Sequence, residues 1–243
     1  MRKFIAVLIL AAACFVRAES SFANKTFVIL GDSSTTKVKS WANIIKERYL
    51  PESCTVINTA VGGSAWEYHG KKKRTPILLQ WQEAEKLLAA QKKTADIIII
   101  TTGGNCFPDS RYSYKDVLDL CDKTDLKDVE TQMKGAITAL KKITEAVPAA
   151  EIYLVANFYA GANPEKDRRR LIYRDQLAAL CDYYACRLID LTRNSCIRGR
   201  LENEKNKRIF TTDRVHAYTE AGKERIAKLI FAAVKQDFPT PEK

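Results

Sequence analysis

The residues best suited to chemistry are a serine, an aspartate and a histidine that lie far apart in the chain. There are only two histidines, His69 and His216, and His216 follows Asp213 by three residues. A serine hydroxyl is a poor nucleophile unless a base lies within hydrogen-bonding distance, and that base needs a third group to fix its tautomer. A turn can bring the Asp213 carboxylate to Nδ1–H of His216 and leave Nε2 for a serine. Ser33, which follows a predicted strand, is the candidate nucleophile.

Acyl transfer also needs preorganised hydrogen-bond donors for the oxyanion, and two glycine-containing motifs offer them. Gly62-Gly63 follows a second predicted strand, where glycine lets a backbone N–H approach a substrate closely. Asn105 ends the motif Gly103-Gly104-Asn105 after a third strand and offers a neutral side-chain N–H. Each polar candidate also has a purely structural interpretation, as a helix cap or as part of a surface turn. The glycines are equally typical of turns.

Alternating strands and helices must position these residues. Five apolar runs rich in β-branched residues predict strands buried on both faces, over 26–30, 55–58, 97–100, 152–155 and 187–190. Amphipathic patterns predict helices over 38–49, 77–91, 129–146, 168–184 and 219–238. Right-handed crossovers then give a three-layer α/β/α fold with a five-stranded parallel sheet. The stretches 106–127 and 194–214 lack periodicity and are expected to be loops. Ligands of such sheets bind beyond the carboxyl ends of the strands, where the candidate residues stand.

Four motifs in this order resemble the blocks of the SGNH (GDSL-type) hydrolases. They are Gly-Asp-Ser-Ser-Thr at 31–35, Asn-Thr-Ala-Val-Gly-Gly at 58–63, Gly-Gly-Asn at 103–105 and Asp-Arg-Val-His at 213–216. Each motif alone is weak, but their order and spacing match over essentially the whole chain after the first 18 residues. The resemblance implies a flavodoxin-like fold and a triad of Ser33, His216 and Asp213. It also implies an oxyanion hole made of the Ser33 N–H, the Gly63 N–H and the Asn105 side chain, with no metal or organic cofactor.

One position departs from the family's pattern. The third block usually continues Gly-x-Asn-Asp, and Cys106 stands where the second acid would be. We expect the missing carboxylate to have supported the loop, a role that a disulfide from Cys106 could fill. Pairing with Cys121 is favoured because it would staple one loop, although six cysteines allow about fifteen pairings. A free, reactive Cys106 would instead disturb the geometry of Asn105.

Residues 1–18 have the pattern of a secretory signal peptide. Arg2 and Lys3 precede an apolar run over 4–16, and Val16-Arg17-Ala18 supplies small residues for cleavage. The run is too short to span a bilayer as a resident helix. A retained N-terminal anchor and a lipid on Cys14 are the alternatives. Residues 19–243 are expected to form a single hydrolase domain, exported to the periplasm or the extracellular space.

Composition limits the partners of this 243-residue chain. Cleavage would remove three of its 40 basic residues and none of its 29 acidic ones, so the net charge falls from +11 to +8. Cleavage or lipidation leaves six cysteines in an oxidising compartment, where disulfides persist. The basic residues are scattered and no nucleic-acid module appears, so nucleic-acid binding is not expected. No run beyond the leader predicts stable membrane insertion.

The leading functional hypothesis is an exported serine esterase that removes acyl groups, with acetyl favoured, from a carbohydrate. It depends on the four blocks and the leader. A lysophospholipase or thioesterase acting on longer acyl chains is the alternative within the same family. A non-catalytic glycan-binding protein with the same fold is the alternative of another class. The acyl chain, the glycan, the regiochemistry and the oligomeric state remain open.

Overall fold

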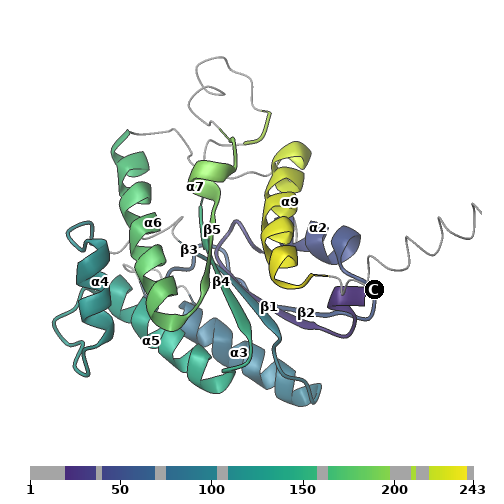
Figure 1. Ribbon diagram of the computed structural model, residues 1–243, viewed down its shortest axis with the longest axis horizontal. Helices are drawn as coiled ribbons and strands as arrows, with labels where there is room; N and C mark the ends of the chain where they lie inside the picture. The colour runs from purple at the N-terminus through teal and green to yellow at the C-terminus, as the bar shows by residue number, and fades with distance from the viewer. Residues whose placement is uncertain are drawn as a thin grey trace, which may run out of the picture.

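The apolar runs form a five-stranded parallel sheet in the order β2-β1-β3-β4-β5 (Figure 1). The computed structural model describes residues 20–36, 40–68, 75–102, 109–157, 164–197, 209–211 and 219–239. The strands are β1 (Thr26–Gly31), β2 (Thr55–Asn58), β3 (Ile97–Thr102), β4 (Glu151–Ala156) and β5 (Arg187–Asp190). From β1 the chain first adds β2 on one side and then crosses to the other side of β1, where β3, β4 and β5 follow in order. This strand order is flavodoxin-like, and its switch point lies at the end of β1.

Helices cover both faces of the sheet (Figure 1). One face carries α3 (Ile77–Ala90), α5 (Thr131–Ala146) and α6 (Pro164–Tyr184), with α4 (Tyr114–Cys121) packed against α6. The other face carries α2 (Trp41–Ile44), which continues as the π-helix η2 (Ile45–Tyr49), and α9 (Glu220–Asp237). The short helices η1 (Ser20–Phe22) and α7 (Leu191–Asn194) precede β1 and follow β5. The expected three-layer architecture is confirmed.

Alternation along each strand divides the core into two layers. In β1, Val28 and Leu30 join the cluster beneath α3, α5 and α6, whereas Phe27 and Ile29 join the cluster beneath α2 and α9. All four side chains are fully buried. Burial of one such side chain stabilises a fold by roughly 1.5–3 kcal/mol, so each strand supports both helical layers.

Aromatic rings join the segment before β1 to the end of α9. The ring of Phe22 lies 5.7 Å from that of Phe27 and 5.5 Å from those of Phe231 and Phe238, centroid to centroid. Tilted aromatic pairs at such distances add about 0.5–1.5 kcal/mol each beyond their burial. The first and last described elements therefore stabilise one another.

The stretch that was expected to be a loop over 106–127 contains a helix. Ser113 caps α4 and forms a capping box with Asp116, while Val117, Leu120 and Cys121 point into the core. Serine followed three residues later by an acid is a helix-start signal, which the lack of a longer apolar period obscured. Helix α6 also begins earlier than expected, at Pro164.

The expected disulfide between Cys106 and Cys121 is wrong. Cys121 is a free thiol on the buried face of α4. The other described cysteines, Cys54, Cys181, Cys186 and Cys196, are also free thiols. Burial in the apolar cluster raises the pKa of the Cys121 thiol to about 12, which opposes formation of the thiolate that disulfide exchange requires. Cys106 lies outside the described residues.

The two expectations about the N-terminal leader cannot be compared with the fold. The leader over 1–18, including Cys14, lies outside the described residues, so the signal peptide and the lipid anchor stay predictions. Of the helices in the described ranges, none is both long and apolar enough to cross a membrane.

Candidate active site

A tight turn at the carboxyl end of β1 presents Ser33. The Thr35 N–H donates to the carbonyl of Asp32 at 3.0 Å, which closes the turn. Within it, Oδ1 of the buried Asp32 accepts from the Ser34 N–H at 2.9 Å and from the Ser34 hydroxyl at 2.8 Å. Such local bonds are typical of Asp at the start of a turn. Ser33 is partly buried at the second position of this turn.

The residue that leads into the turn is held by the sheet and by helix α3. A Cβ on Gly31 would lie 2.2 Å from Oγ1 and 2.6 Å from the carbonyl oxygen of Thr101, so only glycine fits beside β3. Gln80, buried on α3, accepts from the Gly31 N–H at 2.8 Å and donates to the Gly31 carbonyl at 3.1 Å. One amide side chain thus satisfies both backbone groups at the point where β1 ends.

The Gly63 turn is attached to the same residue. The carbonyl of Gly31 also accepts from the Val61 N–H at 3.1 Å, and the Val61 carbonyl accepts from the Ser64 N–H at 3.1 Å. Gly63 has φ 82°, the left-handed value that the third position of a type II turn requires. Gly31 precedes Ser33 by two residues and Val61 precedes Gly63 by two. The structure therefore brings the Ser33 and Gly63 turns to the same edge of the sheet.

Asn58 provides a second link between the first two motifs. Its Nδ2 donates to the carbonyl of Thr35 at 3.1 Å, and its Oδ1 accepts from the Ala60 N–H at 3.0 Å. The side chain thereby fixes the end of the Ser33 turn against the segment that leads to Gly63. The asparagine that begins the second motif has a structural role in the site.

The other three expected site residues, Asn105, Asp213 and His216, lie outside the described residues, and their roles stay predictions. The strand that leads toward Asn105 is described to its end at Thr102. Thr101 pairs with Gly31, so β3 ends directly beside β1, the strand that leads into the Ser33 turn.

The described residues that flank segment 212–218 are fixed to one another. Thr219, the N-cap of α9, accepts from the Gly222 N–H at 3.0 Å and donates its hydroxyl proton to the carbonyl of Ile209 at 2.7 Å. A Cβ on Gly222 would lie 2.0 Å from the Phe210 carbonyl oxygen, so the first turn of α9 packs directly on that backbone. The two ends of the segment with the predicted base and its orienting acid are thus held close together.

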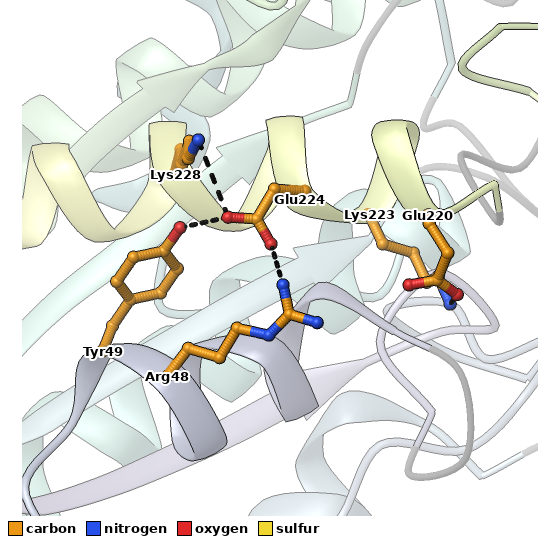
Figure 2. A network of polar contacts seen from close by, with 6 residues as sticks. All are labelled: Arg48, Tyr49, Glu220, Lys223, Glu224 and Lys228. Carbon is orange, nitrogen blue, oxygen red and sulfur yellow. Dashed lines mark hydrogen bonds and ion pairs between the residues drawn. The ribbon is translucent and has the colours of Figure 1, made fainter.

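A polar network joins α9 to the helix that follows the Ser33 turn (Figure 2). The carboxylate of Glu224 accepts from Arg48 at 2.8 Å and from the Tyr49 hydroxyl, and Nζ of Lys228 lies 3.8 Å away. Burial, followed by the hydrogen bond to Glu224, raises the pKa of Tyr49 to about 12. The π-helix η2 and α9 are therefore coupled one turn beyond the Glu220–Lys223 ion pair.

The sequence interpretation missed the bracing role of Gln80. On α3 it stands among the buried Ile77, Trp81 and Ala84. A polar residue within an apolar stripe is the signal that could have identified it, since buried polar groups are almost always hydrogen-bonded. No group of three or more His, Cys, Asp and Glu side chains that could hold a metal ion occurs in the part of the chain that the structure describes.

Comparisons with known proteins identify the fold. No family model and no curated protein matches the sequence. A protein from Lactobacillus plantarum superposes with a TM-score of 0.64 at 15% identity, covering 89% of this chain and 99% of that chain. An acetylxylan esterase from Geobacillus stearothermophilus gives 0.55 at 16%, covering 91% and 98%. A GDSL-like lipase from Bacteroides uniformis gives 0.52 at 18%, covering 88% and 96%.

These similarities extend over nearly the whole of each chain. The chain thus has the three-layer α/β/α fold seen in SGNH (GDSL-type) hydrolases, as the four motifs predicted. The Geobacillus esterase is known in two catalytic mutants, in which an aspartate or a histidine three positions later is replaced by alanine.

Proposed function

We propose that this protein is a carboxylic ester hydrolase with Ser33 as its nucleophile. The observation that carries the proposal is the attachment of two turns to Gly31, which brings the Ser33 turn and the turn of the positive-φ Gly63 to the carboxyl end of the central strands. A serine on a sharp turn after a parallel strand, with a glycine-containing turn at the same edge of the sheet, is an arrangement suited to acyl transfer. The esterases and lipases among the structural neighbours support this choice.

In the proposed mechanism, His216 takes the proton of Ser33 as Oγ attacks the ester carbonyl. Asp213 holds the imidazole in the correct tautomer, and the N–H groups of Ser33 and Gly63 with the Asn105 side chain bind the oxyanion. His216 then gives its proton to the leaving alcohol, and water repeats the sequence on the acyl-enzyme. The Asp213–His216 spacing equals that of the two residues replaced in the catalytic mutants of the Geobacillus esterase.

The proposed substrate is an O-acetyl group on a carbohydrate, hydrolysed after export. Acetylxylan esterases are among the structural neighbours, and the leader over 1–18 has the pattern of an export signal. Expression of the full chain with N-terminal sequencing tests export: secretion predicts a new terminus at Glu19, whereas a lipid-linked Cys14 would show anchoring. Preference for long acyl chains over acetate would favour a lysophospholipase or thioesterase instead.

The activity is tested with p-nitrophenyl esters of increasing chain length, acetylated glycans and a fluorophosphonate probe. Ser33→Ala should abolish both turnover and labelling. Ser53→Ala, which alters an exposed serine at the amino end of β2, should leave both unchanged. Asn105→Ala should lower kcat about 10²- to 10³-fold if its side chain binds the oxyanion. A wild-type protein that neither hydrolyses esters nor reacts with the probe would contradict the proposal and favour a non-catalytic glycan-binding protein.

A further inference from the structure

Three buried polar side chains from distant parts of the chain meet at the carboxyl end of β3. Nε1 of Trp66 donates to the hydroxyl of Tyr173 on α6 at 2.6 Å. The same hydroxyl shares a hydrogen bond with Oγ1 of Thr102, the last residue of β3. The exposed fractions of Trp66, Tyr173 and Thr102 are 1%, 3% and 2%, so these bonds are shielded from water.

The bonding capacities of the three groups make Tyr173 the central member. An indole N–H can only donate, so the Tyr173 oxygen accepts from Trp66 and its own proton can be donated to Thr102. Tyrosine, unlike phenylalanine, can therefore hold both neighbours at once. In a buried site, loss of this hydroxyl would remove a partner from each of them and leave the indole N–H without this acceptor, which is costly away from water.

Trp66 and Thr102, the two residues that Tyr173 joins, stand equally close in sequence to the proposed oxyanion donors. Trp66 follows Gly63 by three residues, and Thr102 precedes Asn105 by three. The backbone next to Trp66 is also fixed, because Gln132 of α5 accepts from the Glu67 N–H and donates to the Glu67 carbonyl, both at 3.1 Å. The Tyr173 hydroxyl therefore joins two residues that each stand close in sequence to a proposed oxyanion donor, and the backbone beside one of them, Trp66, is held by α5.

We propose that Tyr173 is a positioning residue of the oxyanion hole, with its hydroxyl setting the spacing between the segments that carry Gly63 and Asn105. The inference rests on the proposed function. Oxyanion donors act only when they are preorganised, and displacement of a reacting group by about 1 Å can cost about 10²-fold in rate. Tyr173 itself touches no substrate in this arrangement.

A matched control exists in Tyr153, which is also buried and also donates its hydroxyl proton to a partner. Its acceptor is Asp237 at the end of α9, at 2.7 Å, and neither residue belongs to the segments around Gly63 and Asn105. Tyr153→Phe makes the same chemical change in the same fold. A merely structural effect of losing one internal hydroxyl would therefore appear in both variants.

The test compares kcat and KM for p-nitrophenyl acetate in the wild type, Tyr173→Phe and Tyr153→Phe, with urea unfolding of each. We expect Tyr173→Phe to lower kcat about tenfold or more, in line with the loss of a donor's alignment, while KM stays within about twofold. Tyr153→Phe should retain the wild-type kcat. Thr102→Val, which breaks the other bond at constant volume, should reproduce the loss in kcat if Tyr173→Phe folds poorly.

A double variant separates positioning from general weakening. If Tyr173 acts through the oxyanion hole, its substitution in an Asn105→Ala background should cost clearly less than in the wild type, because much of the alignment it provides is already lost. Retention of wild-type kcat by Tyr173→Phe and Thr102→Val, or losses that multiply in the double variant, would overturn the inference while leaving the esterase proposal intact. An inactive wild type would overturn both.

Discussion

Replacing Gln80 with leucine should destabilise the end of β1 strongly. The side chain is 1% exposed and makes three hydrogen bonds, from the Gly31 N–H at 2.8 Å and to the carbonyls of Gly31 at 3.1 Å and Thr75 at 3.2 Å. The Gly31 carbonyl keeps its bond from Val61, but the Gly31 N–H loses its acceptor inside the core. An orphaned buried donor costs about 1–3 kcal/mol and each other lost bond about 0.5–1.5 kcal/mol, so we expect a loss of roughly 2–6 kcal/mol.

This loss is a large part of the roughly 5–15 kcal/mol that stabilises a typical domain. It is measured by urea unfolding, as a lower midpoint at an unchanged slope. Gln82→Leu is the control, because Gln82 is exposed on the same helix and its substitution should change stability by less than about 0.5 kcal/mol. Ester turnover should fall in Gln80→Leu as well, since Gly31 leads directly into the Ser33 turn. Equal midpoints for the two variants would refute the reasoning.

Two further predictions concern α9 and its contacts. Gly222→Ala should lower Tm, because the added Cβ would lie 2.0 Å from the Phe210 carbonyl oxygen. This effect should outweigh the roughly 1 kcal/mol by which alanine usually stabilises a helix relative to glycine. A raised Tm in thermal unfolding would contradict the prediction. Tyr49, with its pKa raised from 10.0 to about 12, should contribute stability that is complete below pH 10.0 and is lost as the pH rises through about 12. Tyr49→Phe should therefore flatten the alkaline decline in urea midpoint over this window, and an unchanged decline would count against the assignment.

The strands were predictable because their apolar, β-branched runs are long enough to be buried on both faces. Their ends were less so: β3 continues through Thr101 and Thr102, polar residues that stay in the sheet because β4 pairs with them. Helix α4 was missed since only Val117, Leu120 and Cys121 face the core, too few to show a period. The disulfide failed because spacing along the chain does not determine the direction in which Cys121 points.

The candidate site also has one part that the sequence predicts and one part that it does not. The placement of the Ser33 and Gly63 turns at one edge of the sheet follows from parallel strand order, because adjacent carboxyl ends share that edge. The bracing by Gln80 and Tyr173 depends on which helix packs over which strand end, and a polar residue in an apolar stripe does not name its partner. Such contacts between distant segments are properties of the packed structure rather than of local sequence.

The contacts of Phe22 with Phe231 and Phe238 have a consequence for how the protein acquires its fold during synthesis. All five strands are complete by Asp190, but α9, which covers Phe27 and Ile29, begins only at Glu220. At roughly 5–20 residues per second, a ribosome needs seconds more to deliver that helix. Throughout that interval a nascent chain with a paired sheet exposes the apolar face that α9 later covers. We expect chaperones to bind to this face and premature association to begin there.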